Sequence, residues 1–238
     1  MGLPDRRSRF WPALAALIGV ALTCALGTWQ LNRAAEKRAL KTRVEAYAAQ
    51  PAIHVAPAEI PAADIEQRPA EARGMFDPGH AVYIDNRLHH GVPGFHVVMP
   101  LRLAGSDRYV LVNRGWIARP DGRREVPAVR TPAGEVTVHG MALLPSTRVL
   151  ELSDQVTEGR IWQNLTIERY RSAMPLSIQP FVIRQDSALD DGLVREWDPP
   201  DFGIERHYGY AFQWFGLAAT IVVFYAVTQF RRNRAQTS

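Results

Sequence analysis

Two apolar segments, one near each end of the chain, constrain the fold more than any other feature of the sequence. Residues 10–31 and 207–230 contain no Asp, Glu, Lys or Arg. Each segment is at least as long as the roughly 20 residues that an α-helix needs to cross a hydrocarbon core of about 30 Å. Trp11 and Trp29 lie near the ends of the first segment, where aromatic residues often mark the lipid–water interface. We therefore predict two transmembrane helices.

The first segment also has the basic start and apolar stretch of a cleaved signal peptide. Its apolar run is long for such a peptide, and a second apolar segment follows near the end of the 238 residues. Both observations favour a retained span at residues 10–31.

The excess of basic residues is confined to the tails. The chain carries 28 basic and 24 acidic residues, a formal net charge of +4, and its pI is about 9.5. Residues 1–33 and 231–238 hold seven Arg and one Asp, which leaves 21 basic and 23 acidic residues in 34–206. A nucleic-acid-binding domain would carry the excess itself, so this class is excluded. The single cysteine, Cys24, excludes an internal disulfide and a metal site of paired Cys.

The Arg residues next to the two segments predict the orientation of the chain. Three Arg follow the second segment, whereas the two Arg before it are diluted by four acidic residues. The positive-inside rule predicts that the tails 1–9 and 231–238 lie in the cytoplasm and residues 32–206 in the periplasm. The two spans would then cross the cell inner membrane. Five basic residues after the first span would favour the opposite orientation, but the charges of long translocated domains contribute little to this rule. They are Arg33, Lys37, Arg38, Lys41 and Arg43.

The region between the two segments has the composition of a strand-rich domain. Residues 34–49 are predicted to continue the first helix as a stalk, and the Pro- and Ala-rich stretch 51–64 is predicted to be a connector. Short β-prone segments, separated by turn residues, follow. They are 70–76, 80–87, 94–103, 108–117, 134–144 and 181–184, with a helix at 164–174. We expect an α+β membrane protein in which two transmembrane helices flank an antiparallel, barrel- or sandwich-like extracytoplasmic domain.

Catalytic signatures are absent from the sequence. It contains no GxSxG, HExxH, GxxxxGK or GxGxxG pattern. A protease with a Ser–Lys pair would need a Lys in the external domain, but Lys37 and Lys41 both lie on the predicted stalk. We therefore expect a protein that is not an enzyme.

His207 stands where the second span begins. An isolated His there is often an interfacial residue with its polar edge among lipid headgroups. The other interpretation is a metal or haem ligand, because the positive end of a helix favours the neutral imidazole that haem iron needs. Two alanines and Trp214 share its helix face at helical spacing and would leave a flat slot for a porphyrin. Alternatively, Ala211 and Ala218 only allow the first span to pack closely.

The first span carries small residues at every fourth position. Such a stripe allows close contact between helices in lipid, so we expect the two spans to touch. The stripe consists of Ala15, Gly19, Thr23 and Gly27.

Other candidate ligands have weaker patterns. His89 and His90 lie in a predicted surface turn where a metal could bind. His96 and Met99 suggest a copper pair, but a spacing of three places them on opposite faces of a strand. Arg114 is either a contact residue or a structural Arg paired with Asp85. Three further histidines have no partner in the sequence: His54, His80 and His139.

Five short segments follow the order of a known family and reach both ends of the chain. They are GTWQLNR (27–33), YIDNR (83–87), VPGFHVVMPL (92–101), YVLVNRGWI (109–117) and HYGYAFQWFGLA (207–218). In these segments, and in its two-span layout, the chain resembles the SURF1/Shy1 family of assembly factors for haem–copper cytochrome oxidases. Because the first span begins at residue 10, a bacterial form is expected.

The resemblance implies a role in the maturation of cytochrome c oxidase subunit I. It implies that haem a binds at His207, with Trp29 of the GTWQ block in the same region. Trp214 is placed beside them by helix spacing alone. The expected partners are subunit I, haem a synthase and the lipid bilayer. A scaffold that stabilises subunit I without binding haem is the alternative.

The sequence departs from the family pattern at two places. The family often has Asn or Glu before this histidine and Leu after it, whereas this chain has Arg206 and Tyr208. Residues 146–160 match the Pro- and Asn-rich segment of the family poorly, which leaves loop contacts there undefined but not the position of the haem.

Overall fold

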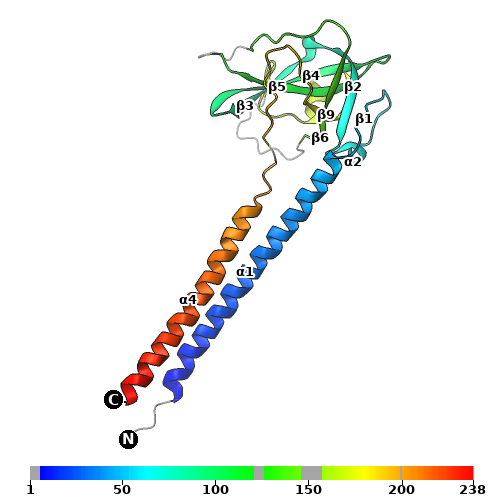
Figure 1. Cartoon of the computed structure of the whole chain (residues 1–238). Helices are drawn as coiled ribbons and strands as arrows, with labels where there is room; N and C mark the ends of the chain where they lie inside the picture. The colour runs from blue at the N-terminus through cyan, green and yellow to red at the C-terminus, as the bar shows by residue number, and fades with distance from the viewer. Residues whose placement is uncertain (1–5, 121–125, 146–156, 199, 238) are drawn as a thin grey trace. The chain divides into compact units, whose positions relative to one another are not determined.

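The computed structural model describes residues 6–120, 126–145, 157–198 and 200–237, and the chain divides into two compact units. The first unit, within 1–43 and 199–238, consists of two long helices, and the second, 44–198, is rich in strands (Figure 1). Most of the stretch 146–160, whose match to the family was weak, lies outside the described residues.

Helix α1 (Arg6–Ala48) and helix α4 (Ile204–Thr237) contain the two apolar segments. Both are long and apolar enough to cross a membrane, and their most apolar windows have mean hydropathies of 1.9 and 1.6. The predicted helices at 10–31 and 207–230 are confirmed, and α1 continues beyond residue 34 as the expected stalk. The helix pair is therefore compatible with membrane anchoring.

The strand-rich unit contains one sheet of nine strands in the part of the chain that the structure describes. The strands are β1 (Ile53–His54), β2 (Pro69–Phe76), β3 (Val82–His89), β4 (Val92–Leu103), β5 (Arg108–Ala118), β6 (Val136–Leu143), β7 (Thr157–Glu158), β8 (Ile161–Trp162) and β9 (Ser177–Gln185). The short helices α2 (Ala62–Ile65) and α3 (Ile167–Ala173) and a 3-10 turn, Pro78–His80, accompany them.

Five of these strands close into a barrel. They follow one another in the order β2-β6-β9-β5-β4, and an additional pairing of β2 with β4 closes the ring. Gly74 permits this closure, because a Cβ there would lie 1.9 Å from the carbonyl oxygen of Arg102 on β4. The expected barrel is confirmed, but the expectation of antiparallel strands is wrong for β5 and β9, which run parallel. A long connection that includes α3 joins these two strands, as parallel neighbours require.

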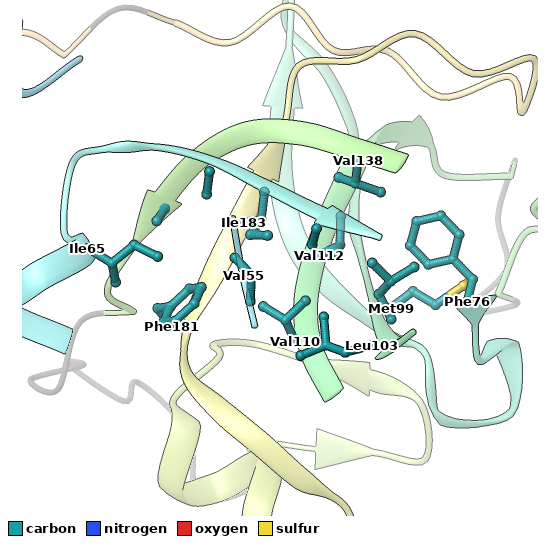
Figure 2. Packing of buried hydrophobic residues seen from close by; sticks show 14 of the residues in the cluster. Val55, Ile65, Phe76, Met99, Leu103, Val110, Val112, Val138, Phe181 and Ile183 are labelled. Carbon is teal, nitrogen blue, oxygen red and sulfur yellow. The ribbon is translucent and has the colours of Figure 1, made fainter. Parts of the chain in front are cut away.

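The main hydrophobic core fills the inside of the barrel (Figure 2). Alternate residues of the barrel strands point inward, so each strand contributes one of its two faces. Buried members include Phe76, Met99, Leu103, Val110, Val112, Val138, Phe181 and Ile183. A second cluster lies outside the barrel, where Tyr170 of α3 packs with Trp162 of β8 and Val98 of β4.

The other predicted elements agree with the structure within a few residues. The N-cap of helix α3 is Thr166, whose Oγ1 accepts a hydrogen bond from the backbone N–H of Arg169 at 3.1 Å. Strand β6 alternates between buried and more exposed side chains along most of its length. The connector 51–64 holds only the short β1 and the start of α2.

Candidate functional site

His207 lies in the first turn of α4 and faces α1. Its Nδ1 lies 2.7 Å from Oε1 of Gln30 on α1. An amide oxygen can only accept a hydrogen bond, so Nδ1 carries the proton and donates it. In the neutral ring, Nε2 then keeps its lone pair, which is the form in which imidazole binds a metal. Among the described residues, Nε2 has no hydrogen-bond partner.

Gln30 is buried between the two helices, with 9% of its surface exposed. A buried amide in an apolar segment needs a hydrogen-bond partner, and His207 supplies it. Gln30 was not among the predicted site residues, although it belongs to the GTWQLNR segment. Helical spacing could have indicated that Gln30 lies on the contact face, because the buried positions of α1 recur every three or four residues. They are Thr23, Gly27, Gln30 and Ala34.

Small residues of α1 admit large side chains of α4. A Cβ at Gly27 would lie 2.8 Å from the ring of Phe215, and one at Gly19 would lie 3.2 Å from Cδ1 of Ile221. The predicted contact between the two spans is confirmed. Ala15, at the end of the predicted stripe, is exposed, because a strict period of four drifts away from the 3.6-residue turn of a helix.

The flat slot expected beside His207 is filled by this packing. Ala211 and Ala218 are only 2% and 6% exposed, since α1 covers their face of α4. The interpretation of these two alanines as packing residues is therefore correct, and the predicted slot is wrong. A hollow of about 320 Å³ lies at the start of α4, but Lys41 and residues 200–206 line it rather than His207.

The two tryptophans expected near His207 lie in different surroundings. Trp29 is 52% exposed, and its position is about 100° around α1 from Gln30. Its ring therefore lies on the outer surface of the helix pair, as an interfacial residue would. Trp214 is half-buried and shares the face of α4 that carries Ala211 and Ala218.

The candidates of the strand-rich unit fall into surface and core positions. The ring nitrogens Nε2 of His89 and His90 lie 3.6 and 3.3 Å from one carboxylate oxygen of Glu196. These three residues could hold a metal ion, although His90 and Glu196 are largely exposed. The other histidines without partners in the sequence lie beside acidic residues: His54 and His139 beside Glu71, and His80 beside Asp77.

His96 and Met99 lie on opposite faces of β4, as predicted. Met99 is in the barrel core, whereas His96 lines a cavity outside it. Burial and the nearby charge of Arg87 lower the pKa of His96 to about 4, so its ring is neutral at pH 7.

Arg114 is a structural residue, but its partner is not Asp85. Its guanidinium is fully buried and donates to Asp191 at 2.8 Å and to the carbonyl oxygen of Arg130 at 2.9 Å. Asp85 pairs with Arg119 instead. The expected pair was wrong because Arg114 is the extra residue of a β-bulge in β5, which turns its side chain toward the core.

Comparisons with known proteins match most of the chain. A family model described as "SURF1 family" matches residues 17–219. A SURF1-like protein of Rickettsia felis is 25% identical over 92% of this chain and 96% of its own length. Surfeit locus protein 1 of Mus musculus is 26% identical over 84% of this chain and 69% of its own length. Because the family match covers most of the chain, the protein belongs to the SURF1 family, whose members are generally known as cytochrome oxidase assembly factors.

Proposed function

We propose that this protein binds haem a through His207 and assists its insertion into subunit I of cytochrome c oxidase. One observation carries the proposal: the hydrogen bond from Nδ1 of His207 to Gln30 leaves Nε2 available as a ligand. Histidines that bind metals usually donate their other ring N–H to an acceptor, which fixes the tautomer and the direction of the lone pair.

The donor chemistry of the site fits a haem, but the packing of α1 on α4 leaves no slot for the macrocycle beside Ala211 and Ala218. His207 is partly exposed. The haem iron would supply the open coordination position that Nε2 fills. Because Ala211 and Ala218 are covered by α1, the proposal assigns no role in haem contact to these residues. Trp29 and Trp214 remain candidates for contact with the macrocycle.

The protein would act without catalysing a reaction. In the proposed arrangement α1 and α4 cross the inner membrane, both termini lie in the cytoplasm, and the strand-rich unit lies in the periplasm. Haem a synthase in the same membrane would deliver the haem, and subunit I would receive it. His207 would hold the haem between these two steps, with Gln30 keeping the ring in one tautomer.

The second candidate function is a scaffold that stabilises subunit I without binding haem. The close packing of α1 on α4 favours it, since the alanine face of α4 is already used for helix contact. A protein of this kind would need the helix pair as an anchor and the barrel as a docking domain.

Absorption spectra of the purified chain distinguish the two candidates. For the spectra the chain is produced in cells with haem a synthase but without subunit I, because subunit I itself receives haem a. Co-purification is examined in a second culture that also produces subunit I, and both preparations are isolated in mild detergent. A haem a band that is lost in His207→Ala, but retained in the surface variant His139→Ala, is the result expected of a haem carrier. Colourless protein that still co-purifies with subunit I would instead establish the scaffold.

A further inference from the structure

A cleft on the strand-rich unit brings together residues from three segments that mark the family resemblance. Arg87 comes from YIDNR, His96 from VPGFHVVMPL and Asn113 from YVLVNRGWI. With Arg184 of β9, they line two adjoining cavities of about 260 and 520 Å³. The larger volume is within the range of about 300–1,000 Å³ that is usual for sites of small molecules. The haem-binding proposal uses none of these four side chains.

Irregular backbone directs Arg87 into this cleft. Strand β3 carries a bulge between Ile84 and Arg87, and Asn86 within it has a φ of +57°. In a regular strand, residues three apart point to opposite faces, yet Ile84 and Arg87 line the same cavity. Bulges of this kind often redirect a side chain beside a functional site. The neighbouring β5 has its own bulge next to Asn113.

Arg87 and Arg184 differ from the other arginines of this unit that have a buried Nε. Four such arginines, Arg68, Arg114, Arg119 and Arg195, donate from their terminal nitrogens to a carboxylate or a carbonyl oxygen. Arg87 and Arg184 have a buried Nε and no side-chain hydrogen bond or ion pair within the described part of the chain. The guanidinium of Arg184 lies over the ring of Trp197, 5.5 Å from its centroid. Asp85 and Asp186 act on Arg87 and Arg184 through charge without an ion pair. Two half-buried cations therefore face the smaller cavity, whose lining contains no Asp or Glu.

Asn113 and His96 also present hydrogen-bond donors to the cleft, whereas the acidic residues Glu196 and Asp198 line the larger cavity alone. Oδ1 of Asn113 accepts from the backbone N–H of Gly115, so its amide nitrogen is turned toward Nδ1 of His96, at 3.5 Å. In the neutral ring of His96, a proton then resides on Nε2. The two guanidinium groups and Nε2–H of His96 have no hydrogen-bond acceptor within the described part of the chain.

We propose that this cleft binds a small amphipathic carboxylate, with its head between Arg87 and Arg184 and its apolar part along the wall of the smaller cavity. Carboxylate oxygens accept hydrogen bonds only, and their geometry matches the fork of an Arg side chain. The apolar wall is built from Ile84, Val98, Leu143, Leu165 and Val182. The inference does not rest on the haem-binding proposal, because it concerns a cleft within residues 44–198.

A ligand series tests the proposal on the full chain in nanodiscs of zwitterionic lipid. Calorimetric titrations compare octanoate, 1-octanol, octylammonium and inorganic phosphate, with empty nanodiscs as the blank. Octanoate is expected to saturate a single site, with at least tenfold tighter binding than octanol, and octylammonium is expected not to bind. Phosphate should bind more weakly than octanoate, because it lacks an apolar part. Equal binding of octanoate and octanol, or tighter binding of phosphate, would overturn the assignment.

Variants of the two arginines supply the second test. Arg87→Gln and Arg184→Gln should each weaken octanoate binding about tenfold or more, since each removes a charge-assisted hydrogen bond. Arg102→Gln, on an exposed arginine of β4 outside the cleft, is the matched control and should bind as the wild type does. If both cleft variants bind octanoate like Arg102→Gln, the proposal is wrong. Should either variant fail to fold, the ligand series on the wild type decides alone.

Discussion

Nδ1 of His207 and Oε1 of Gln30 lie 2.7 Å apart and join the two long helices by a polar contact within apolar segments. This bond fixes the tautomer that leaves Nε2 free. Gln30→Leu is therefore expected to weaken haem binding about tenfold to a hundredfold, as removal of partners behind metal-bound histidines does. Titration of purified apo-protein with haem measures the affinity. Gln213→Leu, the same change at an exposed position of α4, should leave it unchanged. Equal affinities in the two variants would contradict the role given to Gln30.

Contact between the helices depends on Gly27, whose Cβ position is 2.8 Å from the ring of Phe215. Gly27→Leu is expected to push α1 and α4 apart, because the larger side chain meets the ring directly. Nitroxide labels at the exposed positions 22 and 223, in a Cys24→Ser background, report the change as a broader distance distribution.

Gly216→Leu is the control for this change, since no atom lies within 4 Å of that Cβ position. Adding Phe215→Ala to Gly27→Leu should narrow the distribution again. A distribution for Gly27→Leu that matches the control would refute the close packing.

The buried pair of Arg114 and Asp191 is expected to dominate the electrostatics of the barrel. Both side chains are almost fully buried, at 0% and 1% exposure. Asp191→Ala leaves an uncompensated guanidinium and should lower the free energy of unfolding by about 3–5 kcal/mol. Urea unfolding followed by tryptophan fluorescence measures it. The neighbouring Asp190→Ala, at a side chain that is 98% exposed, should change it by no more than about 0.5 kcal/mol.

His96 should make the strand-rich unit less stable at acidic pH. Its pKa in the folded protein is about 4, below its ordinary value of 6.5, because burial and Arg87 disfavour the charged ring. Between these two values the unfolded chain binds more protons, so stability rises with pH across this window and is level above it. Through this residue, the free energy of unfolding is expected to be about 2–3 kcal/mol lower at pH 4.5 than at pH 7.

The variant His96→Gln isolates this contribution. Arg87, Arg184, Glu196 and Asp198 line the same cavity and remain in both proteins, so their titration largely cancels in the comparison. The variant should lose less stability than the wild type between pH 7 and pH 4.5 in urea unfolding experiments. Identical losses would show that His96 does not titrate in this window.

Much of the fold follows from local patterns in the sequence. The absence of charge over 10–31 and 207–230 predicts two long helices, and short β-prone runs between turn residues predict six of the nine strands. The parallel pairing of β5 with β9 has no local signal, because it depends on a connection tens of residues long. The short strands β1, β7 and β8, of two residues each, carry too little pattern to be predicted.

The candidate site was predictable only in part. The position of His207 at a helix start suggests a ligand, and the spacing of small residues predicts the contact between helices. That the amide of Gln30 meets His207 depends on the register of α1 against α4, which no single helix reveals. In the barrel, bulges displace Arg87 and Arg114 from the strict alternation of side chains on which strand predictions rest. The predicted ion pair between Arg114 and Asp85 was wrong for this reason, since Arg114 pairs with Asp191.

The haem content of purified protein tests the proposed function most directly. The wild type and His207→Ala are each produced with haem a synthase, purified in parallel, and their haem a is extracted and related to protein concentration. Binding through Nε2 of His207 predicts a ratio near one haem per wild-type chain and a near-complete loss in the variant. Equal haem content in the two proteins, or none in the wild type, would contradict the proposal.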